Sequence, residues 1–137
     1  MADTFVLYDL DVIVERIDGQ CTCSMRVGDR FSLRSGKVST PAGKDFCLYA
    51  LQATIPLLPA KQRQNHPADW METDARVTCP DPACRLIMKI ERVGRRKLSH
   101  DDVSAVPLGQ GASAESTVPL SPRTRPARRP PRRRPRA

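Results

Sequence analysis

The feature that most constrains this chain is the confinement of its core-forming residues to the first two thirds of the sequence. All six aromatic residues and all five cysteines lie at or before residue 84. Beyond residue 97 the sequence is dominated by Ser, Ala, Pro, Gly and Arg, a composition that buries too little apolar surface to offset the entropy cost of ordering. We therefore predict one small domain over residues 1–97, a linker over 98–120 and a disordered Arg/Pro-rich tail over 121–137.

The excess positive charge of the chain lies entirely in that tail. The sequence has 23 Lys and Arg against 15 Asp and Glu, and eight of the arginines fall within residues 121–137. Proline disfavours helix and like charges repel, so an extended tail is expected. An Arg/Pro tract attracts phosphates, but without aromatic side chains it cannot stack on bases. Two interpretations stay open: non-specific association with nucleic acid through the tail, or a tail that is merely solvated.

The chain lacks sequence signals for membrane insertion or secretion. No run of about 18 apolar residues occurs, and the start Met1-Ala2-Asp3 has no basic segment of the kind that opens a secretory signal. A cytoplasmic protein with no membrane partner is the expectation. Thiols stay reduced in that compartment, so the five cysteines are predicted to be free, metal-bound or catalytic rather than paired.

Alternating apolar and polar residues predict strands at both ends of the domain. Residues 6–15 place apolar side chains on one face: Val6, Tyr8, Leu10, Val12 and Val14. After a turn at Asp18-Gly19, a second strand is expected over 27–34, with Phe31 and Leu33 pointing inward. Two further strands, over 75–79 and 85–93, flank a proline-rich connection.

A helix is predicted between the two pairs of strands. From Asp45, apolar residues recur at helical spacing: Phe46, Cys47, Ala50 and Leu51. Asp45 suits the N-cap, and Pro56 with Pro59 should end or kink the helix. Residues 60–74 are expected to form a loop that Trp70 pins to the core. The predicted fold is α+β, in the order β-β-α-β-β, with a small antiparallel sheet covered by one helix; its exposed edges leave a homodimer open.

A set of short motifs spans about residues 7–93. They are Gly19-Gln20-Cys21, Val27-Gly28-Asp29-Arg30-Phe31, Cys47-Leu48-Tyr49-Ala50-Leu51, Pro56-Leu57-Leu58-Pro59, Asp69-Trp70 and Cys79-Pro80-Asp81-Pro82. In these motifs the chain resembles a family of small uncharacterised bacterial and archaeal proteins of about this domain's length. The resemblance implies that the family's recurring thiols are Cys21, Cys47 and Cys79, and that Cys23 and Cys84 are additions. Family members often carry a histidine after the first cysteine, where this chain has Ser24-Met25.

The five cysteines are the main candidates for chemistry. Thiolates favour zinc or an iron–sulfur centre, and we expect Cys21, Cys47 and Cys79 as the core ligands, with Cys23 or Cys84 completing four. The spacings Cys-x-Cys and Cys-x4-Cys differ from the Cys-x2-Cys knuckles of zinc ribbons. The sequence favours a small thiol-rich binding module that serves an unidentified ligand or partner protein, and zinc would add folding energy to it.

An enzyme is the alternative, with Cys47 as nucleophile or redox thiol. In the first turn of the predicted helix, unpaired N–H groups favour its thiolate, and Lys44 adds to this effect. Acyl transfer also requires a base, and His66 oriented by Asp69 is the candidate pair, because His100 falls in the predicted linker. A histidine in a polar loop such as His66-Pro67 is, however, more often a solvated surface residue than a base. The isolated glycines form no phosphate-binding loop, which disfavours nucleotide-dependent catalysis.

Overall fold

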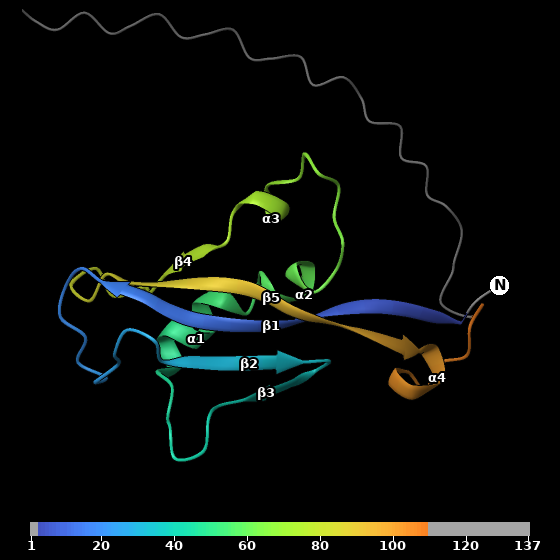
Figure 1. Cartoon of the computed structure of the whole chain (residues 1–137), viewed down its shortest axis with the longest axis horizontal. Helices are drawn as coiled ribbons and strands as arrows, with labels where there is room; N and C mark the ends of the chain where they lie inside the picture. The colour runs from blue at the N-terminus through green and yellow to red at the C-terminus, as the bar shows by residue number, and fades with distance from the viewer. Residues whose placement is uncertain (1–2, 110–137) are drawn as a thin grey trace, which may run out of the picture. The chain divides into compact units, whose positions relative to one another are not determined.

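Two fourteen-residue strands, β1 (Thr4–Ile17) and β5 (Leu86–Ser99), form the centre of the fold (Figure 1). A computed structural model of the chain describes residues 3–109. The two strands pair antiparallel along their whole length, from Thr4 opposite Ser99 to Ile17 opposite Leu86. The five-stranded sheet has the order β3-β2-β1-β5-β4. Its outer strands are β2 (Arg30–Arg34), β3 (Lys37–Ser39) and β4 (Arg76–Thr78).

The α+β class and the antiparallel sheet expected from the sequence are confirmed, with one strand more than expected. The additional strand, β3, pairs with β2 through a tight turn at Ser35-Gly36. Ser35 adopts a left-handed conformation there, with a φ of 56°. All three residues of β3 are exposed, so no inward-pointing apolar pattern marked this strand in the sequence.

The core lies on one face of the sheet. It is built by the inward-facing residues of β1, β2 and β5 together with one residue each from two helices; these include Leu10, Val12, Val14, Phe31, Leu33, Met88, Ala50 and Leu58. The predicted apolar face of β1 is therefore confirmed from Leu10 to Val14. Val6, by contrast, is 50% exposed; it lies before the register shift between Asp9 and Leu10, outside the buried stretch.

The helical segment begins later than expected and is interrupted. Cys47, not Asp45, is the N-cap of α1 (Leu48–Thr54), so the expected Asp45 cap was wrong. Pro56 follows the end of α1, as its missing N–H requires. A second short helix, α2 (Leu58–Lys61), then carries Pro59 in its first turn, where proline is tolerated.

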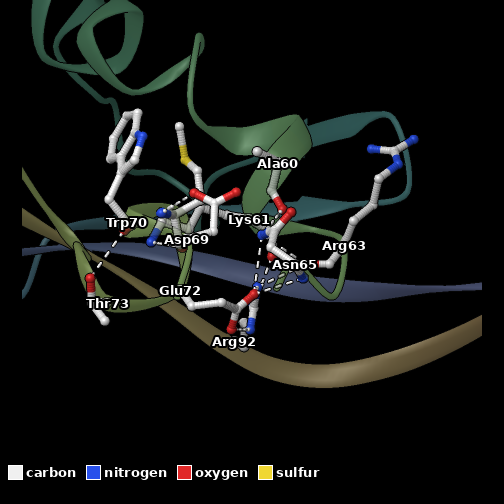
Figure 2. A network of polar contacts seen from close by, with 10 residues as sticks. Ala60, Lys61, Arg63, Asn65, Asp69, Trp70, Glu72, Thr73 and Arg92 are labelled. Atoms are coloured by element: carbon white, nitrogen blue, oxygen red, sulfur yellow. Dashed lines mark hydrogen bonds and ion pairs between the residues drawn. The ribbon is translucent and has the colours of Figure 1, made fainter. Parts of the chain in front are cut away.

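The segment from Lys61 to Thr73, which contains α3 (Trp70–Thr73), is held by polar contacts rather than by its tryptophan. Trp70 is 57% exposed, so the expectation that it pins the loop was wrong. Figure 2 shows the contacts that take its place. The guanidinium of Arg92 donates to both carboxylate oxygens of Glu72 at 2.8 Å, to the Lys61 carbonyl at 2.9 Å and to the Arg63 carbonyl at 2.8 Å.

The last strand continues beyond the domain boundary expected at residue 97. β1 begins at Thr4 and offers β5 a pairing partner as far as Ser99, and α4 (His100–Val103) follows directly. The His100 N–H also donates to the Asp3 carbonyl. The rest of the predicted linker, beyond residue 109, and the Arg/Pro-rich tail over 121–137 lie outside the described residues. Among the described helices, none has the length and apolar character needed to cross a membrane.

Candidate thiol site

The pairing of β1 with β5 brings two cysteine-bearing segments to the same end of the sheet. β1 ends at Ile17 and β5 begins opposite it at Leu86. The segment that leaves β1 carries Cys21 and Cys23, and the segment that enters β5 carries Cys79 and Cys84. Antiparallel neighbours place the end of one strand beside the beginning of the other, so these four cysteines converge although about 60 residues separate the two segments.

Backbone hydrogen bonds hold these two segments against each other. The Gln20 N–H donates to the Ala83 carbonyl at 3.0 Å, and the Arg85 guanidinium donates to the Asp18 carbonyl at 2.7 Å. Gly19 lies between them at a very close approach, where a Cβ atom would lie 2.0 Å from the Ala83 oxygen. Only glycine, which has no Cβ atom, fits this contact, so the position of the first cysteine segment depends on a glycine at position 19.

The second cysteine segment is a tight turn that orders Cys79 and Cys84. The Cys79 N–H donates to the Leu86 carbonyl at 2.8 Å and closes the turn. Within it, the Asp81 carboxylate accepts from the Ala83 N–H at 2.9 Å, a contact typical of turn-forming aspartates. Both cysteines are buried and belong to the core cluster.

The fifth cysteine, Cys47, comes from the helix layer. It precedes α1, which packs on the core through Ala50. The Cys47 Sγ lies 3.2 Å from the Cys23 Sγ, within hydrogen-bond distance for sulfur. Cys23 is exposed and Cys47 is half-buried, so this pair lies at the outer rim of the cluster.

All five cysteines line one cavity of about 440 Å³, which we call the thiol cavity. Its other walls include Tyr49, Pro80 and Leu86. A second cavity of about 530 Å³ shares Cys23 and Cys47 with the first, and we call it the polar cavity because charged residues line it: Arg26, Asp29, Lys44 and Asp45. Cys23 and Cys47 therefore stand between an apolar, sulfur-rich space and a charged one.

The thiols influence one another's ionisation. The hydrogen bond to Cys47, followed by the charge of Cys47, raises the pKa of Cys23 to about 11. Burial raises the pKa of Cys84 to about 11, and the hydrogen bond to Cys21 and the charges of Cys21 and Cys79 add to that rise. The neighbouring thiols therefore disfavour the thiolate forms of Cys23 and Cys84.

Cys47 is the exception within this group. Burial acts to raise the pKa of Cys47, but hydrogen bonds from the Ala50 N–H, from Cys23 and from the Tyr49 N–H outweigh it, so its pKa is lowered. Of the Cys23–Cys47 pair, Cys47 therefore ionises first, and Cys23 keeps its proton and shares it with Cys47 in a hydrogen bond.

The thiol cavity contains the donor atoms of a metal site without yet having its arrangement. Within residues 3–109, no three side chains of His, Cys, Asp or Glu already stand in a metal-binding group. Of the sequence-predicted ligands, Cys21, Cys23, Cys47, Cys79 and Cys84 all face the same cavity.

The structure does not bring the predicted base to Cys47. His66 is exposed, and its Nδ1 accepts from the Ala68 N–H at 3.1 Å. The Asp69 carboxylate caps α3 by accepting from the Met71 N–H at 2.9 Å. Neither residue lines either of the two cavities that Cys47 borders. The set of Cys47, His66 and Asp69 therefore has no shared site here for acyl transfer.

Two features of the site were beyond sequence reasoning. The contact between Cys23 and Cys47 joins residues 24 positions apart and depends on how α1 sits over the sheet. The role of Gly19 depends on its distance from Ala83, although the Asp18-Gly19 turn was itself a sequence signal.

Comparisons of the chain with protein-family models, curated proteins and solved structures gave no match. The resemblance seen in the cysteine motifs therefore stays a prediction, and the thiol cavity itself is the feature that indicates a function.

Proposed function

We propose that this domain is a small thiol-rich binding module that holds one soft metal ion, zinc, in the thiol cavity. One observation carries the proposal: five cysteines from three separate segments line the same cavity. Thiolate sulfur is a preferred ligand of zinc, and structural zinc sites take four cysteine or histidine ligands in a tetrahedron.

The inner ligands in this proposal are Cys21, Cys79 and Cys84. Cys21 and Cys79 both contribute to the raised pKa of Cys84, which supports a common site for the three. Cys47 is the fourth ligand, because it borders the same cavity and is less exposed than Cys23. Cys23 is left outside the set.

Electrostatics supports a cation at this position. The raised pKa of Cys84 reflects burial and the neighbouring thiols, so ionising these groups together is unfavourable in the metal-free protein. A divalent ion reverses that balance, because it binds thiolate and displaces the protons. Zinc uptake should therefore release protons and become tighter as the pH rises.

The size of the domain supports a structural role for the ion. A chain of about 100 residues buries little more than 60% of its unfolded surface, so its core alone gives modest stability. The thiol cavity joins the loop after β1, the turn before β5 and the start of α1. A zinc ion that binds all three would add the binding energy to the folding energy.

Elemental analysis with native mass spectrometry on protein purified without oxygen tests the proposal. We expect one zinc per chain in the folded protein and loss of that zinc in Cys79→Ser. The matched control is Thr78→Ser, which changes an exposed β4 residue next to Cys79 and should retain the metal. Folded protein that contains no metal and takes up no added zinc would contradict the proposal.

An iron–sulfur centre is the other occupant that the same ligands would accept. It would appear in the same analysis as iron with inorganic sulfide, and it would colour the protein. That result would change the proposed occupant from zinc to an iron–sulfur centre, and the cysteine ligands would stay the same.

A further inference from the structure

We propose that Cys23 and Cys47 form a dithiol that exchanges with small disulfides bearing both positive and negative charges. The geometric basis is the 3.2 Å separation of the two Sγ atoms, from residues 24 positions apart. A disulfide bond requires about 2.05 Å between sulfurs, so a shift of little more than 1 Å joins them. This activity needs only the two thiols, and it goes beyond the proposed metal function.

The two sulfurs are accessible from a space large enough for a substrate. Both cysteines border the polar cavity of about 530 Å³ as well as the thiol cavity. Cys23 is exposed and Cys47 is half-buried, whereas Cys79 and Cys84 are buried. A disulfide molecule entering from solvent would therefore meet Cys23 and Cys47 before it met Cys79 or Cys84.

The lining of the polar cavity indicates the class of disulfide. Arg26 and Lys44 provide positive charge, and Asp29 and Asp45 provide negative charge, around the same two sulfurs. A disulfide with carboxylates and ammonium groups can pair with both kinds of side chain. A neutral disulfide can pair with neither.

The exchange proceeds in two balanced steps. The Cys47 sulfur attacks one sulfur of the substrate, the substrate S–S bond breaks, and the departing half takes a proton and leaves as a thiol. The Cys23 thiol then loses its proton, its sulfur attacks the Cys47 sulfur, and the second half leaves as a thiol. Two electrons pass from the protein dithiol to the substrate, so one disulfide becomes two thiols and the protein gains a Cys23–Cys47 disulfide.

The order of attack follows from the contacts of Cys47. Cys47 directly precedes α1, which packs on the core through Ala50 and fixes the position of the residue. Cys23 lies in an exposed loop and can follow its movement. Cys47 is therefore the attacking thiol and Cys23 the resolving thiol.

The test uses full-length reduced protein, with oxidised glutathione as the charged probe and hydroxyethyl disulfide as the neutral one. Peptide mapping should find a Cys23–Cys47 disulfide as the main product. In Cys23→Ser, a mixed disulfide with glutathione should accumulate on Cys47. In Lys44→Ala, the rate with glutathione disulfide should fall by a factor of about two to five, the size of one exposed ion pair, with little change for the neutral probe.

Other outcomes would overturn the inference. A main product that pairs other cysteines, or no protein disulfide at all, removes the dithiol. The assigned order of attack is wrong if a mixed disulfide accumulates on Cys23 in the Cys47→Ser variant while none forms on Cys47 in the Cys23→Ser variant. If Lys44→Ala slows the exchange equally with both probes, the charged substrate class is wrong.

Repeating the assay with added zinc and with a chelator separates this inference from the metal proposal. Zinc bound to Cys47 slows the exchange, whereas the zinc-free protein exchanges at its full rate.

Discussion

The Arg92 network and the thiol cavity both tie loops to the central strands, but they satisfy their polar groups to different degrees. In the network, which consists of Arg92, Glu72, Asn65 and the carbonyls of Lys61 and Arg63, the guanidinium makes four hydrogen bonds and lies 4.3 Å from the Tyr8 ring centre. In the thiol cavity, the sulfurs have mainly one another as partners.

Because of this difference, the Arg92 network is a structural cluster, whereas the thiol cavity can still bind a ligand. Within the described residues, no buried side-chain nitrogen or oxygen lacks a hydrogen-bond partner. The Arg92 network is close to that completeness, because four of the five guanidinium N–H groups already donate within it. The thiols contribute weak hydrogen bonds only, so their stronger interactions, with a metal or with another sulfur, are still to be made.

Removing Arg92 should produce the largest loss of stability. Arg92→Ala removes four hydrogen bonds, two to the Glu72 carboxylate and two to backbone carbonyls, and we expect the free energy of unfolding to fall by about 2–3 kcal/mol. Urea unfolding measures this change. Arg95→Ala is the matched control, because Arg95 is exposed and only approaches the Tyr8 ring at 5.5 Å, and it should change stability by less than about 0.5 kcal/mol. Equal losses in the two variants would show that the network is not what anchors the loop.

The next largest effect is expected at the close contact beneath the thiol cavity. Gly19→Ala places a Cβ atom 2.0 Å from the Ala83 oxygen, so the two cysteine segments must separate. We expect a loss of about 1–3 kcal/mol, as for other overpacked sites, together with loss of bound zinc. Gly36→Ala, where nothing lies within 4 Å of the new Cβ, is the control. A Gly19→Ala protein of unchanged stability and zinc content would contradict the assigned contact.

Acid should weaken the Arg92 network within a defined range of pH. The hydrogen bonds from Arg92, followed by that from the Asn65 N–H, lower the pKa of Glu72 from 4.5 to about 2. Because the folded-state pKa is the lower one, the ionised carboxylate stabilises the fold above pH 4.5, and this contribution is lost as the pH falls towards 2. Glu72→Gln should therefore reduce stability at pH 7 and flatten its decline between pH 5 and 2 in urea titrations.

The control for this titration is Glu91→Gln, which removes a half-exposed carboxylate outside the network. It should leave the decline close to that of the unchanged protein. If the stability of Glu72→Gln falls with pH as steeply as that of the unchanged protein, other carboxylates determine the acid sensitivity.

The parts of the fold that sequence could predict are those governed by local periodicity. Alternation from Leu10 to Val14, and at Phe31 and Leu33, identified the buried faces because each face of a strand repeats every second residue. The same alternation extends from Leu86 to Arg92 and puts a charged residue on the apolar face. That pattern signals a paired arginine, but nothing local identifies Glu72, twenty residues earlier, as its partner.

The remaining features depend on contacts that close only in three dimensions. The extension of β5 to Ser99 depends on β1 offering a partner there, and the extra residue at Val93 in the pairing depends on both strands together. The cysteine motifs favoured a shared site, but the pairing of Cys23 with Cys47 depends on the placement of α1. Short-range patterns contain no information on such distances.

The position of Trp70 differs most from what the composition of the chain suggested, and its removal is expected to have the smallest effect on stability. As the one tryptophan of the chain, in an otherwise polar segment, it suggested a hydrophobic anchor for the loop. Its side chain is 57% exposed, so little apolar surface returns to water when it is removed. We expect Trp70→Ala to change the free energy of unfolding by less than about 0.5 kcal/mol in the urea experiment used for Arg92→Ala. A loss as large as that of Arg92→Ala would mean that the indole anchors the loop as strongly as the Arg92 network does.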